Sequence, residues 1–234
     1  METHPTSVFT TQAAAAERVT AFLRKVYGWM FLGLGLTAFV AYSVASSPGV
    51  MRVLVGNPFL FFGLFAVELG LVWYLSARVD KIAPGNAAAL FVIYSALNGV
   101  TLSAILLVYT GASIATTFVI TAAMFGALAI YGTLTTRSLA GVGQFAMMGL
   151  IGLILASLVS FFWHSDALEF LISIVGVIVF TLLTAYDSQR LRQMATALPD
   201  GRVGSYAVVG ALSLYLDFIN LFLMLLRLLG GRRE

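Results

Sequence analysis

The stretch LYLDFINLF, Leu214–Phe222, places Asp217 in the middle of an apolar run. The run extends over Ser205–Leu226, which is long enough to cross a bilayer core as a helix. A carboxylate at the centre of such a helix costs about 2.5–3.5 kcal/mol on insertion scales, so it normally faces protein or water. We therefore predict that this helix is buried among other membrane helices.

Asp217 also belongs to a polar stripe along this helix. The stripe repeats at steps of four and three residues, which places its members on one helical face. Its members are Tyr206, Gly210, Ser213, Asp217, Asn220, Met224 and Arg227. We expect this face to line a cavity. The alternative is that Ser213 and Asn220 only form hydrogen bonds with neighbouring helices.

The composition extends this interpretation to the whole chain. Of the 234 residues, 60% are hydrophobic and only 10% are charged, whereas soluble domains carry about a quarter charged residues. Six further continuous apolar runs precede the last one: Tyr27–Ala45, Phe59–Ala77, Ala87–Tyr109, Ser113–Tyr131, Val142–Trp163 and Leu168–Tyr186. We predict an all-α integral membrane protein in which residues 22–234 form one domain of seven transmembrane helices. Residues 1–21 are expected to be a cytoplasmic tail.

Basic residues set the expected orientation, because cytoplasmic loops carry an excess of Lys and Arg. Nine of them fall on one side: Arg18, Arg24, Lys25, Arg78, Lys81, Arg137, Arg190, Arg192 and Arg202. The opposite loops among the first six helices hold only Arg52, so we predict a cytoplasmic N-terminus. Arg232 and Arg233 emerge outside if the seventh helix spans fully, or inside if it is re-entrant. The length of the run favours a full span.

Asp187, in TAYDSQRL at Thr184–Leu191, follows the sixth apolar run. Taken alone, it could be a solvated charge at a helix end. The connection over 188–204 returns to the same side, so Asp187 and Asp217 can approach if the seventh helix begins in the headgroup region. Two carboxylates in contact cannot both ionise cheaply, and such a pair would titrate as a unit.

Three polar residues of the second and third helices are further candidates. Arg78, at the cytoplasmic boundary, is either the counter-charge to the aspartate pair or a residue that only sets topology. Glu68 lies near mid-membrane, where its role is functional or structural. Asn98 lines the same cavity or forms an interhelical hydrogen bond. We regard Glu68, Asn98, Ser213 and Asn220 as a candidate ion pathway.

Several motifs resemble those of the transmembrane Bax inhibitor motif family, in its bacterial branch. They include FLRKVYGWMFLGLGLTAFVAY from Phe22, VELGLVWYLSARV from Val67, TAYDSQRL, and GALSLYLDFINLFLMLLRLLGGRRE from Gly210. The resemblance implies seven helices, six of them around the last, and a pH-sensitive calcium leak. It implies that Asp187 and Asp217 form the sensor, with Arg78 and Glu68 as the arginine and glutamate of the second helix. It also implies modulation of a membrane-bound quality-control protease.

We therefore expect a pH-sensitive calcium leak of the bacterial inner membrane, monomeric in the lipid bilayer, without a cofactor or a nucleic-acid partner. Asp187 and Asp217 would be transient calcium ligands. Calcium prefers six to eight oxygen ligands, so a smaller set favours release over tight binding.

Two other functions compete with this expectation. The first is a non-conducting interaction protein that modulates a membrane-bound protease through its N-terminal tail. The second is an intramembrane aspartyl protease. We do not expect an enzyme of this class, because LYLD stands where such enzymes carry GxGD.

Overall fold

The fold is a bundle of seven long helices, given by a computed structural model that describes residues 5–163 and 165–233. The elements are α1 (Pro5–Ala45), α2 (Pro48–Gly56), α3 (Pro58–Ala77), α4 (Pro84–Leu102), α5 (Ile105–Val108), α6 (Gly111–Leu134), α7 (Ala140–Phe162), α8 (Asp166–Ala197), the 3₁₀ turn η1 (Asp200–Arg202) and α9 (Val203–Leu229). The helices α1, α3, α4 and α6 to α9 are long and apolar enough to cross a membrane. This confirms the predicted fold class.

Local sequence signals explain where the helices begin. Pro48, Pro58 and Pro84 occupy the first helical turn of α2, α3 and α4, where the missing N–H costs nothing. The Thr110 side chain accepts a hydrogen bond from the Ser113 N–H and caps α6. These residues therefore mark where the helices begin after the connections.

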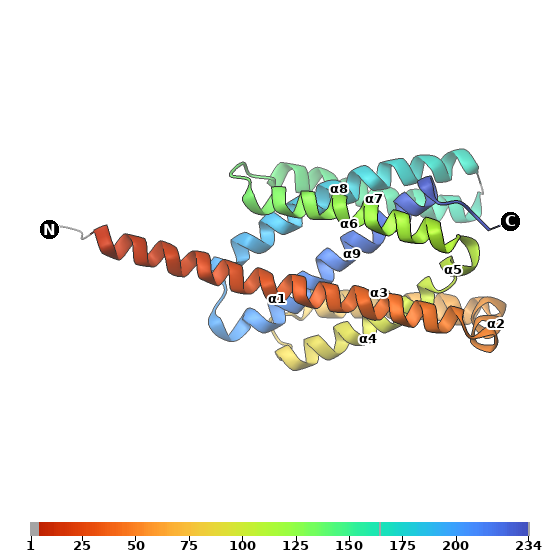
Figure 1. Cartoon of the computed structure of the whole chain (residues 1–234), viewed down its shortest axis with the longest axis horizontal. Coiled ribbons are helices and arrows are strands. Elements are labelled where there is room, and N and C mark those ends of the chain that lie inside the picture. The colour runs from red at the N-terminus through yellow and green to blue at the C-terminus, as the bar shows by residue number, and fades with distance from the viewer. Residues whose placement is uncertain (1–4, 164, 234) are drawn as a thin grey trace.

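The C-terminal helix α9 is the centre of the bundle. Of its most apolar window, 67% is buried within the protein, against 11% for α3 and for α7. Figure 1 shows α9 between a group formed by α1, α3 and α4 and a group formed by α6, α7 and α8. The helices α8, α1, α6 and α4 pack directly on α9, whereas α7 packs mainly on α8. Large apolar side chains on the outer helices face outward, as a lipid environment requires.

The predicted N-terminal tail is helical where it is described. The helix α1 begins at Pro5 and runs without a break into the first span, and Figure 1 shows it projecting beyond the other helices. Residues 1–4 of the predicted tail lie outside the described residues. The tail is an extension of α1 because its run of alanines around residue 14 favours a helix.

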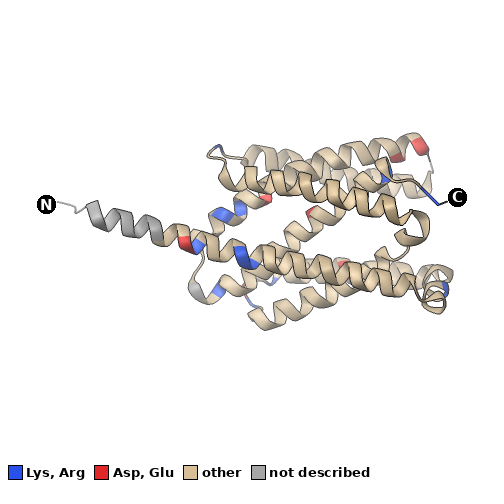
Figure 2. Cartoon of the chain, in the orientation of Figure 1, with Lys and Arg blue, Asp and Glu red and all other residues tan. Residues whose placement is uncertain are grey.

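The two ends of the described chain lie at opposite ends of the bundle (Figure 1). Gly231 N–H donates to Ser113 Oγ (2.9 Å), and Arg233 N–H donates to the Val108 carbonyl (2.9 Å), which ties the chain end beside α5 and α6. The helix α9 therefore crosses the bundle completely. Figure 2 shows most Lys and Arg at the end with the α3–α4, α6–α7 and α8–α9 connections, which we call the basic end.

Candidate functional site

Asp187 meets the polar stripe of α9 at Ser213. The two helices form an antiparallel hairpin closed by the short connection 198–202, and Asp187 and Ser213 are equally far from it along the chain. The Ser213 Oγ donates a hydrogen bond to Asp187 Oδ2. Arg190, one turn later on α8, acts electrostatically on the same carboxylate. The contact joins the central helix to α8.

Asp217 lies one turn after Ser213 on the same face of α9, further from the basic end. Its side chain is only 5% exposed, and its Oδ2 has no hydrogen-bond partner among the described residues. Asp187 acts on it electrostatically, yet no hydrogen bond joins the two carboxylates within the described part of the chain. Asp187 and Asp217 therefore lie near each other at the α8–α9 contact, where Ser213 is bonded to Asp187, and their role as a pair stays a prediction.

The position of Asp187 within its helix differs from the expectation. The apolar run ends at Tyr186, but α8 continues to Ala197, about 16 Å further along the helix axis. Hydropathy falls there because QRLRQ is polar, while its residues remain good helix formers. Asp187 is therefore a mid-helix residue that faces α9, and the interpretation as a charge at a helix end is wrong.

Gly210, Ser213 and Met224 of the polar stripe face α8. At Gly210, a Cβ would lie 2.5 Å from Leu191 Cδ2, and at Gly176 a Cβ would lie 2.7 Å from Met224 Cγ. Glycine therefore stands where the two helices approach most closely. Asn220, also on the stripe, donates to the Leu216 carbonyl of its own helix (2.8 Å) and forms no other described hydrogen bond. Its predicted place in an ion pathway stays a prediction.

Glu68 anchors a second polar cluster. Its carboxylate accepts hydrogen bonds from Asn98 Nδ2 (3.2 Å) and from Thr101 Oγ1 (2.6 Å). The Tyr215 hydroxyl of α9 donates to Asn98 Oδ1 (2.9 Å) and lies 2.6 Å from Thr37 Oγ1 of α1. Glu68 is only 4% exposed. These bonds join α1, α3, α4 and α9 around one buried carboxylate.

The two clusters lie on opposite sides of the central helix. Tyr215 is two residues from both Ser213 and Asp217, which is a rotation of about 200° around a helix. Glu68 and Asn98 therefore lie on the other face of α9 from the aspartates, and their predicted place in one ion pathway with them stays a prediction. The separation arises because α8 packs on one face of α9, while α1 and α4 pack on the other.

Tyr215 and Thr37 were missed in the sequence. Both stand in apolar runs, where a tyrosine or a threonine is usually part of the packing. The only available signal was a tyrosine beside Asp217 in the most buried helix, because a buried hydroxyl normally needs a partner.

Arg78 lies at the C-terminal cap of α3, where its side chain is exposed. Among the described residues it forms no ion pair with Asp187 or Asp217. The helix α3 packs mainly on α4, touches α9 only slightly, and is not a main neighbour of α8. The role of Arg78 as a counter-charge therefore stays a prediction.

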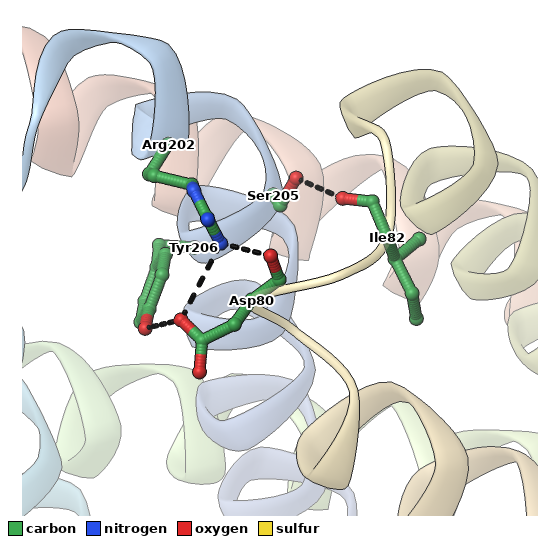
Figure 3. Close-up of polar contacts among 5 residues, drawn as sticks. All are labelled: Asp80, Ile82, Arg202, Ser205 and Tyr206. Atoms are coloured by element: carbon green, nitrogen blue, oxygen red, sulfur yellow. Dashed lines mark hydrogen bonds and ion pairs between the residues drawn. The ribbon is translucent and has the colours of Figure 1, made fainter.

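The start of α9 is held to the α3–α4 connection (Figure 3). The Tyr206 hydroxyl donates to Asp80 Oδ1 (2.5 Å), and Ser205 Oγ donates to the Ile82 carbonyl (2.7 Å). Arg202 Nη1 donates to the Asp80 carbonyl and lies 3.6 Å from Asp80 Oδ1. These contacts at the basic end join the start of the central helix to the α3–α4 connection.

Calcium ligation would depend on few carboxylates. Within residues 5–163 and 165–233, no group of three or more His, Asp or Glu side chains is arranged to hold a metal ion. Asp187 and Asp217 offer two carboxylates, and Ser213 adds one hydroxyl oxygen. Such a set falls short of the six to eight oxygens that a tight calcium site uses.

Comparison with known proteins identifies the family. A family model described as "Inhibitor of apoptosis-promoting Bax1" matches residues 19–234. The Inner membrane protein YbhL of Escherichia coli K12 is 51% identical over 215 residues, which cover 91% of this chain and 92% of that protein. A protein of Borreliella burgdorferi is 47% identical over 215 residues, covering 91% and 93%, and protein RP147 of Rickettsia prowazekii is 40% identical over 219 residues, covering 93% and 92%. The chain therefore belongs to the Bax inhibitor family of membrane proteins, whose motifs its sequence resembles.

Proposed function

We propose that this protein is a pH-sensitive calcium leak of the bacterial inner membrane, gated where α9 meets α8. The observation that carries the proposal is Asp217, a carboxyl group buried at the middle of the central helix with an unpartnered oxygen. A group of this kind is expensive inside a membrane, and such groups mark ion and proton pathways. The name of the similar Escherichia coli protein supports the inner membrane as its location.

The gate works through charge at the α8–α9 contact. In the closed state, a proton held by the aspartates limits the charge at the contact, and Ser213 joins α9 to Asp187. When pH rises and the proton leaves to water, Asp187 and Asp217 carry two negative charges that repel each other. Separation of the helices or entry of a cation relieves this repulsion. A gate whose two states differ by a few kcal/mol can be moved by such a change.

Calcium is the transported species rather than a resident ligand in this proposal. The aspartates attract the cation, while their small number of oxygen atoms allows its release. Arg190 already acts on Asp187 from the same helix, and Arg78 is the proposed counter-charge when α9 moves. The basic end also carries nine Lys and Arg, which supports a cytoplasmic location for this end.

Calcium flux into liposomes that hold purified protein, measured across pH, tests the proposal. We expect wild-type flux to change with pH, and Asp217→Asn and Asp187→Asn each to lose this change. The double variant should add little, because the two residues act as one unit. The matched control is Asp166→Asn, an exposed aspartate in the first turn of α8, which should keep the wild-type profile.

Two outcomes would refute parts of the proposal. If both single variants fold and keep the wild-type pH profile, the aspartates are structural. If folded wild-type protein conducts no calcium at any pH, the interaction role with a membrane-bound protease is favoured. The projecting start of α1, exposed at Glu17 and Arg18, is then the candidate contact.

A further inference from the structure

A groove between α1 and α6 runs along the outside of the bundle. It encloses about 400 Å³ and is lined by apolar side chains that include Tyr27 and Met30 of α1, Phe125 and Ala129 of α6, and Phe218 of α9. The groove exists because α1 packs mainly on α4 and α9, while α6 packs mainly on α8 and α9. The central helix contributes Phe218 to the lining of the groove.

Small residues keep the groove open. Gly126 lies in its lining, and a Cβ at this position would meet nothing within 4 Å. Five glycines that pack against α8 or α9 are different, because a Cβ there would collide with the neighbouring helix: Gly132, Gly143, Gly149, Gly176 and Gly210. Gly126 therefore borders open space rather than a helix contact.

The length of the groove selects its occupant. On α6 the lining runs from Ala122 to Leu134, which is about 18 Å along the helix. A bilayer core is about 30 Å thick, so the groove covers about one leaflet. A partner transmembrane helix would need the full thickness, whereas one lipid acyl chain needs a single leaflet.

The charged side chains near the groove are arginines at the basic end. Arg24 lies three residues before Tyr27 and therefore near the same face of α1, and its side chain is exposed. Arg137 follows the end of α6 and is also exposed. Arg192 of α8 donates from Nη1 to the carbonyl of Thr133, a lining residue (2.5 Å). Neither Arg24 nor Arg137 forms an ion pair with a described residue.

We propose that this groove binds an anionic phospholipid, with an acyl chain along α1 and α6 and its phosphate held by Arg24 and Arg137. Guanidinium groups suit phosphate oxygens because they donate two parallel hydrogen bonds. Basic pockets between membrane helices at the cytoplasmic side are known to hold anionic headgroups. The proposal does not depend on calcium conduction.

Native mass spectrometry of the purified protein in mild detergent tests the site. Phosphatidylglycerol and phosphatidylcholine with identical acyl chains are added in equal amounts, and the bound lipids are counted. We expect wild-type protein to retain phosphatidylglycerol preferentially. Arg24→Gln and Arg137→Gln should each reduce this preference about fivefold, and Arg52→Gln, at the opposite end of the bundle, should leave it unchanged.

A second set of variants fills the groove. Gly126→Leu should lower retention of both lipids without loss of folding, because it enters open space and raises helix propensity. Gly126→Val is the smaller alternative if the leucine variant does not fold. Gly152→Leu is the matched control, since Gly152 is an exposed glycine of α7 with nothing within 4 Å of its Cβ position.

Three results would overturn the proposal. Equal retention of the two lipids by wild-type protein would remove the role of the anionic headgroup. Unchanged retention in folded Gly126→Leu or Gly126→Val would place the lipid elsewhere. A wild-type dimer that Gly126→Leu converts to a monomer would show that a second copy of the chain occupies the groove.

Discussion

Tyr215→Phe isolates the hydrogen bonds that the central helix makes with the Glu68 cluster. The hydroxyl lies 2.9 Å from Asn98 Oδ1 and 2.6 Å from Thr37 Oγ1, and Tyr215 is fully buried. The ring makes edge contacts with Phe91 and Tyr94, at centroid distances of 5.8 and 5.7 Å. Because phenylalanine keeps the ring, the substitution removes the hydroxyl and little packing.

The expected loss of stability follows from the partners left behind. Asn98 Oδ1 loses the donor that Tyr215 supplies, and a buried polar atom without a partner costs about 1–3 kcal/mol. We therefore expect Tyr215→Phe to lower the free energy of unfolding by about 1–3 kcal/mol. A double-mutant cycle of Tyr215→Phe with Thr37→Val measures the interaction energy between the two side chains. We expect this energy to be smaller, about 0.6 and at most about 1.7 kcal/mol, as for other interhelical hydrogen bonds in membranes.

Equilibrium unfolding in mixed micelles measures both quantities. Tyr131→Phe is the control for the single change, because Tyr131 is 53% exposed on α6, and its effect should stay within about 0.5 kcal/mol. Thr121→Val is the control for the double-mutant cycle, since Thr121 is buried but donates only to the Thr117 carbonyl of its own helix. The reasoning fails if Tyr215→Phe is as stable as wild type, or if its coupling to Thr37→Val equals that to Thr121→Val.

Three further predictions concern packing, the basic end and topology. Gly132→Ala should destabilise the protein by about 1–3 kcal/mol, because its Cβ would collide with the Ala185 carbonyl of α8, whereas Gly126→Ala on the same helix should not. Unfolding in micelles compares the two variants, and equal stability would contradict the close approach of α6 and α8. Asp80→Ala should lower stability by less than about 1 kcal/mol, because the ion pair with Arg202 is solvent-exposed; a larger loss in the same assay would mean that the contact holds α9 in place. Reporters fused to the two chain ends should report opposite sides of the membrane, since α9 crosses the bundle completely; activity of both on one side would contradict this.

The sequence by itself determined the class of fold and the central place of α9. Seven apolar runs must become helices, because a bilayer offers no other partner for backbone hydrogen bonds. Asp217 in the last run required burial, since a carboxyl group facing lipid is expensive. The approach of Asp187 to this helix could also be predicted from the sequence, because a short connection brings neighbouring helices together.

Only the tertiary structure decided how the polar residues divide. Hydropathy reports where lipid ends rather than where a helix ends, so it could not show that α8 continues beyond Asp187 to Ala197. It also could not separate Glu68 from the aspartates, because both are simply polar groups in apolar runs. The packing of α8 on one face of α9, and of α1 and α4 on the other, places Asp187 with Ser213 and Glu68 with Tyr215. Which face meets which neighbour depends on contacts between distant segments, and these contacts have no signature within any one helix.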